Sequence, residues 1–170
     1  MLAAGDPGNA GFRAAMRLLV SGVVMVTTRL DGRPWGLTIS ACCSLSAQPP
    51  QVLISLGSGT VTCRQVLQTG QFGLSLLSTE HRRLAEVGAA PGTPKFVDDF
   101  CERCEASGDG MPRVRGALYH LDCVVATSQV IADHTVVIGE VKQTVPGDEA
   151  EVEPLIYFDR TYRQVGSGVA

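Results

Sequence analysis

Apolar and polar residues alternate in short runs along most of this chain, a pattern that is typical of β-strands. The runs at residues 23–28 and 35–41 flank Asp31-Gly32, a dipeptide well suited to the positive φ angles of a type I′ hairpin turn. The first two strands are therefore predicted to be antiparallel neighbours. Further strands are predicted at residues 43–46, 51–56 (after the Pro49-Pro50 break), 71–77, 117–130, 135–144, 155–158 and 162–165.

Helical spacing predicts three short helices, at about residues 12–19, 60–68 and 79–87. Gly70 is a C-terminal signal for the second helix, and Ser78 is a candidate N-cap for the third. Many strands with few helices and mostly hairpin-like connections predict an antiparallel β-barrel with helices outside it. The chain shows neither the βαβ rhythm nor the G-x-G-x-x-G motif of a Rossmann domain.

Length and composition fit a single domain at residues 9–166, between flexible ends at 1–8 and 167–170. The formal net charge is −3, and no basic run is interleaved with aromatic residues, which argues against a nucleic-acid partner. No apolar stretch reaches the roughly 18 residues that a membrane span requires, and the N-terminus lacks the pattern of a secretory signal. We therefore expect a soluble, cytoplasmic protein without a membrane partner.

The cysteines do not form the pattern of a disulfide framework or a zinc site. A chain of this length and apolar content does not need disulfides, so most thiols are expected to be free and partly buried. Cys101 and Cys104 have the C-x-x-C spacing of a metal or redox site, but zinc needs four ligands and Cys42-Cys43 has no spacer. No metal is expected, and thiol redox chemistry stays an open alternative.

Small hydroxylated residues gather on the second and third predicted strands. Thr38 and Ser40 lie two apart, so their side chains share one face of a strand, and Ser44 and Ser46 repeat the arrangement. Such a face lets a planar ring approach backbone N–H and C=O groups, while hydroxyls suit a polyol chain. The alternative is that Thr and Ser simply occupy a half-exposed strand.

Ser58-Gly59-Thr60 opens the second predicted helix, and Arg64 follows one turn later. Free N–H groups, hydroxyls and a flexible glycine at a helix start form a good seat for a phosphate, and Arg64 adds a planar positive charge. The alternative is ordinary N-capping by Ser58. It does not explain a cation near the positive end of the helix dipole.

Asp133-His134 lies between two long strands. Histidine is easily placed for hydrogen bonding near neutral pH, and Asp133 could fix its tautomer, although a turn histidine is more often just solvated. The chain contains no G-x-S-x-G or H-E-x-x-H motif and no other convincing nucleophilic constellation. This poverty in acid–base groups is compatible with hydride transfer, in which cofactors carry the chemistry.

The segment from Gly22 to Leu56 resembles the opening of the flavin reductase family, whose pattern is roughly G-V-x-V-V-T-T, D-G-x-x-x-G-x-T-x-S/N-A and S-x-S-x-x-P-P. Further similarities follow in the same order along the chain, as far as about Val165. They are residues 72–77 (F-x-V-N-V-L), Lys95-Phe96 (K-F), 116–123 (G-A-x-A-x-L-E-C), 132–141 (G-D-H-x and G-x-V) and 154–163 (P-L-x-Y-x and Y-R).

The resemblance implies an antiparallel split β-barrel of the FMN-binding type that forms a homodimer. It implies an NAD(P)H-dependent flavin reductase that binds FMN or FAD, accepts hydride from NADH or NADPH, and supplies reduced flavin to a separate monooxygenase. Two other functions stay open: a flavoenzyme that retains its flavin and acts on an organic substrate, and a non-catalytic flavin- or ligand-binding barrel.

The resemblance also implies which residues bind the cofactors. The isoalloxazine ring would lie against Leu37, Thr38, Ser40, Ala41, Cys42, Cys43, Ser44, Ser55 and Leu56. The phosphate end would meet Ser58, Thr60 and Arg64, with Lys95 and Phe96 also at the site, and the nicotinamide side would have His134 with Tyr162 or Arg163. Ser75 replaces the family's usual Asn, Ala132 replaces a Gly, and the acidic segment 98–105 departs from the family pattern.

Overall fold

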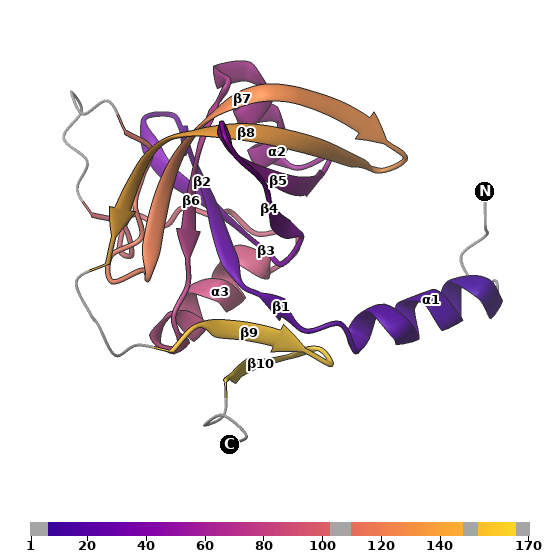
Figure 1. Ribbon diagram of the computed structural model, residues 1–170. Coiled ribbons are helices and arrows are strands. Elements are labelled where there is room, and N and C mark those ends of the chain that lie inside the picture. The colour runs from indigo at the N-terminus through magenta and orange to yellow at the C-terminus, as the bar shows by residue number, and fades with distance from the viewer. Residues whose placement is uncertain (1–6, 103–109, 148–152, 166–170) are drawn as a thin grey trace.

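The computed structural model describes residues 7–102, 110–147 and 153–165, and Figure 1 shows the arrangement of their elements. In chain order these are α1 (Pro7–Arg17), β1 (Ser21–Gly22), β2 (Val24–Leu30), β3 (Arg33–Ile39), β4 (Cys42–Ala47), β5 (Pro50–Gly57), α2 (Val61–Thr69), β6 (Gln71–Leu76), the 3-10 helix η1 (Thr79–His81), α3 (Arg82–Ala89), β7 (Tyr119–Ile131), β8 (His134–Pro146), β9 (Leu155–Phe158) and β10 (Thr161–Gln164). The ends predicted to be flexible lie outside the described residues, except for Pro7 and Gly8 in α1. None of the described helices is long and apolar enough to cross a membrane.

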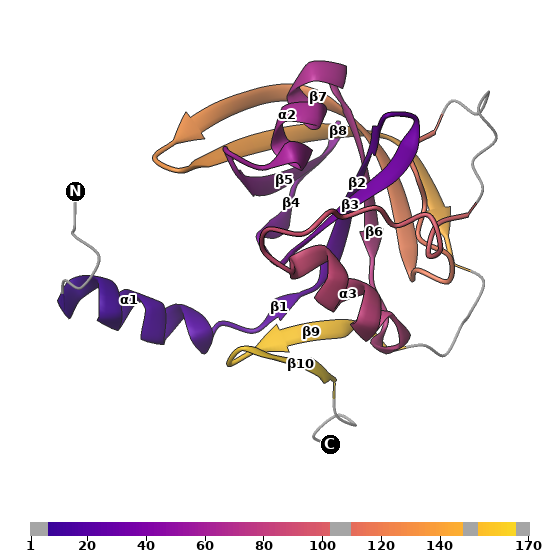
Figure 2. The same ribbon diagram turned by 180° about the vertical axis from the view of Figure 1, so that it is seen from behind.

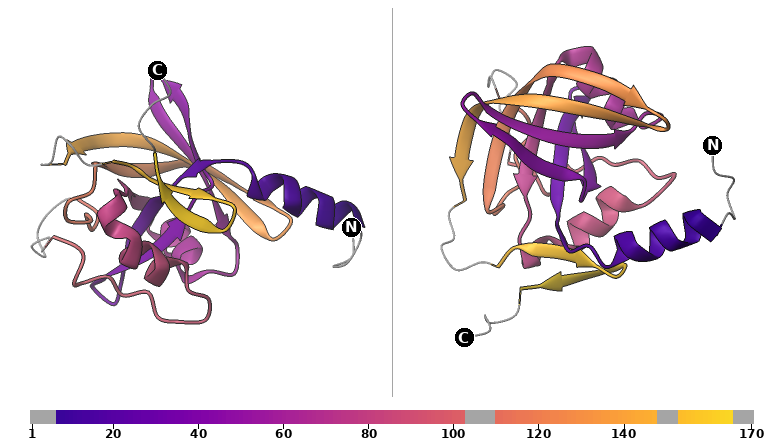
Figure 3. Two further views of the ribbon diagram at one scale, coloured as in Figure 1. Left: turned by 90° about the horizontal axis from the view of Figure 1, so that it is seen from below. Right: turned by 45° about the vertical axis from the view of Figure 1, so that its right-hand side comes forward.

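Seven antiparallel strands form one sheet in the order β3-β2-β6-β7-β8-β5-β4. Its edge strands, β3 and β4, are joined by only Ser40 and Ala41, so the sheet curls until its two edges approach each other (Figure 3). Within the described chain no ladder pairs β3 with β4, which leaves a seam between them. The predicted antiparallel split barrel is confirmed.

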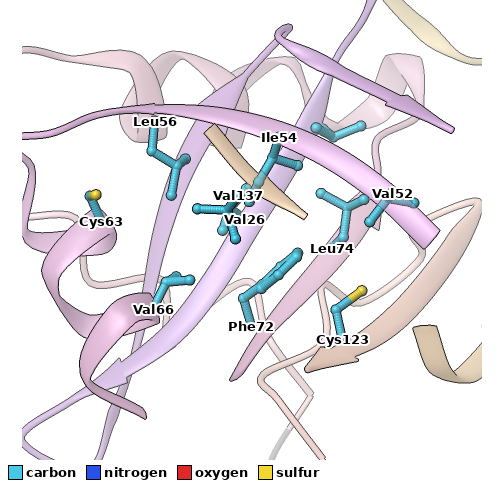
Figure 4. Packing of buried hydrophobic residues seen from close by; sticks show 11 residues of the cluster. Val26, Val52, Ile54, Leu56, Cys63, Val66, Phe72, Leu74, Cys123 and Val137 are labelled. Atoms are coloured by element: carbon cyan, nitrogen blue, oxygen red, sulfur yellow. The ribbon is translucent and has the colours of Figure 1, made fainter. Parts of the chain in front are cut away.

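The interior of the barrel is one apolar cluster (Figure 4). Strands contribute alternate residues to it, and Cys63 and Val66 of α2 close one end. Phe72 is fully buried at the centre and needs Gly139 on β8, because a Cβ at Gly139 would lie 2.4 Å from the Phe72 Cζ. The strand residues in the cluster are Val24, Val26, Val52, Ile54, Leu56, Phe72, Leu74, Cys123 and Val137.

A second apolar cluster lies on the outer face of β2, under α3 and the small sheet β1-β9-β10. Figure 2 shows α3 between β3 and β9. Gly88 lets α3 approach β3 closely, because a Cβ there would lie 2.3 Å from the Thr38 Oγ1. The Tyr162 hydroxyl of β10 donates to the Ala85 carbonyl of α3 at 3.2 Å. Strand β2 is therefore buried on both faces.

The predicted hairpin between the first two strands is confirmed. Asp31 and Gly32 have φ angles of 52° and 75°, as a type I′ turn requires, and β2 and β3 are antiparallel partners. The other predicted strands are also present, with ends shifted by a few residues. Local turn chemistry and alternation are strong signals because they act over a few neighbouring residues.

The connection between α3 and β7 includes a segment that pairs with β3. The Gly36 N–H donates to the Lys95 carbonyl at 2.9 Å, and the Val97 N–H donates to the Pro34 carbonyl at 3.1 Å. These bonds cover part of the outer edge of β3, which would otherwise expose unpaired backbone groups. A short edge pairing of this kind leaves no periodic pattern in the sequence.

We predict that Gly139→Ala destabilises the barrel. The added methyl group would overlap the Phe72 ring in a fully packed interior, and overpacking of this kind costs about 1–3 kcal/mol. Urea unfolding measures the change. Gly22→Ala is the matched control, because no atom lies within 4 Å of a Cβ built there, and its effect is expected within about 0.5 kcal/mol. Equal stability of the two variants would contradict the proposed packing.

Candidate functional site

Two hollows lie along successive parts of β3. The larger, which we call the α2 hollow, has a volume of about 530 Å³ and is lined by Trp35, Leu37, residues 59–62 and residues 92–96. The smaller, the tyrosine hollow, has a volume of about 210 Å³ and is lined by Val23, Thr38, Ile39, Ser40, Ala89, Tyr157 and Tyr162. Trp35 and Leu37 of β3 line the α2 hollow, whereas Thr38 and Ile39 at the end of the same strand line the tyrosine hollow.

The start of α2 forms the polar end of the α2 hollow. Thr60 is the N-cap: its hydroxyl accepts from the Cys63 N–H at 3.1 Å and donates to the Gly57 carbonyl at 2.8 Å. The N–H groups of a first helical turn and the positive end of the helix dipole favour an anion. The alternative that Ser58 caps this helix is wrong, because Thr60 holds that position.

Ser58 instead ties the turn before α2 to the β7–β8 hairpin. Its N–H donates to the Asp133 carbonyl at 2.9 Å, and its hydroxyl lies 2.9 Å from the Thr135 Oγ1. Gly57 is the strand partner of His134, so the hairpin turn lies beside the approach to α2. The structure thus brings the Asp133-His134 turn close to Ser58, a neighbourhood that the sequence did not predict.

His134 is half exposed, and its Nδ1 lies 2.9 Å from the Asp133 Oδ1. The hydrogen bond from His134 lowers the pKa of the Asp133 carboxyl. The predicted pairing of these two side chains is therefore confirmed. Within one chain, however, His134 lies at the tip of the β7–β8 hairpin and Tyr162 lies on β10, at the other end of the molecule (Figure 1).

Lys95 and Phe96 form the wall of the α2 hollow opposite α2. The Lys95 amine donates to the Ala90 carbonyl, and burial lowers its pKa. The Phe96 ring packs edge-to-face against Trp35, with centroids 5.0 Å apart. The Arg33 guanidinium lies 4.0 Å from the centroid of the same Phe96 ring. These contacts hold Lys95 and Phe96 in place in the wall.

Thr38 and Ser40 line the tyrosine hollow together, as their spacing predicts. The Tyr162 ring lies 5.3 Å from the Tyr157 ring in the same hollow. Burial raises the pKa of the Tyr162 phenol, which keeps it neutral as a hydrogen-bond donor. Arg163 is exposed, with its guanidinium 5.5 Å from the Phe158 ring, and is not among the residues that line this hollow.

Strand β4 differs from the prediction. A register shift at Ser44 and Ser46 interrupts the alternation, so Ser44 is exposed whereas Ser46 is half-buried. Cys42 packs against the barrel core, and burial raises the pKa of its thiol to about 11. Cys43 is exposed. The Cys42 thiol therefore stays protonated at neutral pH, and the protonated form is unreactive.

Arg64 is exposed on α2 and is not among the residues that line the α2 hollow. Ala41 and Ser55 meet through a backbone bond of 3.0 Å beside the seam, while Leu56 points into the barrel core. The structure therefore brings Leu37, Thr60, Lys95 and Phe96 together in one hollow. It leaves Arg64 and Ser58 beside that hollow.

The departures from the family pattern have structural partners. The Ser75 hydroxyl lies 2.8 Å from the His120 Nδ1 and accepts from the Val114 N–H at 3.3 Å, so Ser75 serves the packing of the barrel wall. Ala132 has a φ of 54°, in the region that favours glycine. Asp98 of the acidic segment pairs with Arg33 at 3.0 Å, whereas residues 103–105, including Cys104, lie outside the described residues.

Sequence reasoning missed Trp35, Thr62 and Tyr157. Trp35 is the chain's single tryptophan and lies three residues after the hairpin turn, a signal that could have drawn attention to it. Thr62 is fully buried on α2, whereas Leu67 of the same helix is exposed. In the parts of the chain that the structure describes, no cluster of His, Cys, Asp or Glu could hold a metal ion.

The family model described as "Flavin reductase like domain" matches residues 16–166 of this chain. This chain belongs to the flavin reductase family. The resemblance inferred from the motifs is thereby confirmed.

Curated members of the family are similar over most of their length. Flavin reductase (NADH) of Kitasatospora aureofaciens is 35% identical over 153 residues, which are 89% of this chain and 78% of the relative. Flavin reductase (NADPH) of Lentzea aerocolonigenes is 33% identical, covering 90% of this chain and 88% of the relative. The reductase component of 4-nitrophenol 4-monooxygenase/4-nitrocatechol 2-monooxygenase of Rhodococcus opacus is 32% identical, covering 88% and 77%.

Solved flavin reductase structures have the same fold. Flavin reductase PheA2 gives a TM-score of 0.80 at 30% identity, covering 94% of this chain and 99% of that chain. The NADH:FAD oxidoreductase SgcE6 of Streptomyces globisporus, in complex with NAD and FAD fragments, gives a TM-score of 0.80 at 26% identity, covering 97% and 98%.

We predict that Thr60→Ala weakens the start of α2. Loss of the cap leaves the Cys63 N–H without its acceptor, which costs about 1 kcal/mol of stability. Urea unfolding measures this loss. Thr69→Ala at the other end of α2 is the control, since its hydroxyl is exposed and bonds backbone groups of the nearby Gln65 and Gln71, and its effect is expected below about 0.5 kcal/mol. A Thr60→Ala variant as stable as the parent would rule out this cap.

Proposed function

We propose that this protein is an NAD(P)H:flavin oxidoreductase that transfers hydride from NADH or NADPH to FMN or FAD. The observation that carries the proposal is the α2 hollow, in which an apolar wall and a helix start face each other. Relatives at 32–35% identity bear the names of NADH- and NADPH-dependent flavin reductases and of a monooxygenase reductase component. Reduced flavin would pass to a separate flavin-dependent monooxygenase.

The α2 hollow fits a flavin in size and in chemistry. Its volume of about 530 Å³ falls within the range of about 300–1,000 Å³ that small-molecule sites span. Leu37, Trp35 and Phe96 offer apolar surface to a planar ring, while the first N–H groups of α2 offer donors to a phosphate. These groups support the proposed flavin site.

In the proposed arrangement, the phosphate lies at the start of α2 beside Ser58 and Thr60. The ring lies against Leu37 and Phe96 in the α2 hollow and reaches along the backbone of residues 38–44 and 55–56 toward the tyrosine hollow. Arg64, one turn into α2 and exposed, would fold over the phosphate and screen its charge. Lys95 adds a second positive charge at the opposite wall. Two cations facing a dianion support binding of the phosphorylated flavins FMN and FAD.

The bound flavin supplies the hydride chemistry, and the residues of this chain bind, orient and exclude water. The neutral phenol of Tyr162 and the hydroxyl of Ser40 line the tyrosine hollow, where we place the nicotinamide side. Arg163 and His134 are exposed and available to a nicotinamide nucleotide. The proposed mechanism assigns no side chain as an acid or a base, because hydride passes directly between the two cofactors.

We predict that purified protein oxidises NADH or NADPH only when FMN or FAD is added. A panel that crosses the two nucleotides with the two flavins, followed by absorbance at the nicotinamide band, measures the rates. Heat-denatured protein is the control. Absence of a flavin-dependent rate in all four combinations would overturn the proposed function. A flavin that survives gel filtration, with slow consumption of free flavin, would instead favour a flavoenzyme that acts on its own substrate.

We also propose that the protein is a homodimer. Helix α1 extends away from the barrel and is tied to it by Arg17, which bonds Asp159 (Figure 2). Phe12 and Met16 on α1 are 64% and 47% exposed. At the tip of the β7–β8 hairpin, Val130 and Ile131 are also exposed. Apolar surface of this extent suits burial against a second copy, which would also bring His134 of one chain toward the tyrosine hollow of the other.

We predict that Phe12→Ser combined with Met16→Ser disrupts the dimer. The polar side chains remove apolar area that the second copy would bury, so the mass in solution should fall from about twice 17.9 kDa to 17.9 kDa. Size-exclusion chromatography with light scattering measures it. Leu67→Ser, at an exposed leucine on α2, is the control and should remain dimeric. A monomeric parent protein at micromolar concentration would exclude this proposal.

A further inference from the structure

Trp35 joins three walls of the α2 hollow. It lies on β3, its ring packs edge-to-face against Phe96 with centroids 5.0 Å apart, and its backbone forms an antiparallel bridge with the same residue. The indole Nε1–H donates to the Thr62 Oγ1 of α2 at 3.1 Å. One side chain therefore connects β3, the 92–96 wall and the first turn of α2.

The bond between Trp35 and Thr62 is sheltered from water. Trp35 is 7% exposed and Thr62 is 1% exposed, so neither group can exchange its partner for solvent without opening the packing. The indole N–H can only donate, and Thr62 supplies its acceptor. Removing the acceptor would leave the buried indole N–H unpaired. Because an unpaired buried donor costs free energy, the groups around Trp35 would shift to give it another partner.

Phe96 is also held by a contact with Arg33. The Arg33 guanidinium covers the Phe96 ring at 4.0 Å and is itself held by Asp98 at 3.0 Å. A continuous line of contacts thus runs from Asp98 through Arg33, Phe96 and Trp35 to Thr62. This line of contacts sets the distance between the two walls of the hollow, and Trp35 is the residue in it that contacts α2.

We propose that Trp35 is a positioning residue for the flavin: through its bond to Thr62 it sets the distance between the start of α2, which takes the phosphate, and the wall that takes the ring. This inference rests on the proposed function and deepens it. The residue acts before the hydride step, because it shapes the empty hollow. Its loss should weaken flavin binding without slowing the turnover of flavin that is bound.

The same placement makes Trp35 a reporter of the site. It is the chain's single tryptophan, so all tryptophan emission comes from the wall of the α2 hollow. The flavin absorbs in the range where tryptophan emits, and a flavin in this hollow would lie next to the indole. We therefore expect FMN or FAD to quench the emission in a saturable way, which gives a dissociation constant without any assay of activity.

The test compares Thr62→Val, Thr62→Ser and Trp35→Phe in the full chain. Valine keeps the shape of threonine but removes the acceptor, whereas serine keeps it. We expect Thr62→Val and Trp35→Phe to raise the KM for flavin about tenfold with kcat within about twofold of the parent, and Thr62→Ser to restore the parent value. The quenching titration of Thr62→Val should show the same weakening.

Two controls separate positioning from general destabilisation. Thr69→Val removes a hydroxyl from the exposed end of the same helix and should leave the KM unchanged. The double variant Trp35→Phe with Thr62→Val should be no weaker than the weaker single variant, because both remove one bond. Additive losses, or an unchanged KM in Thr62→Val with intact folding, would overturn the inference.

The outcome is distinguishable from a failure of the proposed function. If no nucleotide is oxidised but flavin quenches Trp35 and Thr62→Val weakens the quenching, the positioning role stands and the reductase activity falls. If the activity is present but neither flavin changes the emission of Trp35, the flavin lies elsewhere and the inference falls.

Discussion

The two-residue connection between β3 and β4 is the constraint on which the rest of the structure depends. These strands are the two edges of one seven-stranded sheet, and Ser40 with Ala41 cannot span a flat sheet of that width, so the sheet curls. The curled sheet encloses Phe72 and its apolar neighbours. The edges approach without forming a ladder, and β3, the strand on one side of this seam, lines both hollows.

The seam persists because part of the β3 edge has another partner. Backbone bonds from Gly36 to Lys95 and from Val97 to Pro34 satisfy groups that β4 would otherwise compete for. The same segment carries Phe96 to the hollow beside α2. Protection of a sheet edge and construction of a binding wall are therefore one feature of this fold, and its alteration would affect both stability and ligand binding.

The chemistry of the hollow follows from where its walls come from. A strand and a loop provide Leu37, Trp35 and Phe96, which suit a flat ring, whereas a helix start provides oriented N–H groups, which suit an anion. A phosphorylated flavin has both parts in one molecule. Membership of the flavin reductase family and the geometry of the hollow thus support the same class of ligand by independent routes.

The sequence by itself determined the strand pattern, the Asp31-Gly32 turn, the helix start near Thr60 and the family, because turn angles, alternation and motifs are local properties of a few residues. Only the tertiary structure decided that Thr60 and not Ser58 caps α2, that Trp35 bonds Thr62, and that His134 and Tyr162 lie apart within one chain. The last two relations join residues far apart in the chain, and the first follows from the bonds that hold Ser58 to Asp133 and Thr135. They depend on the curl of the sheet and on close packing, which no local pattern encodes.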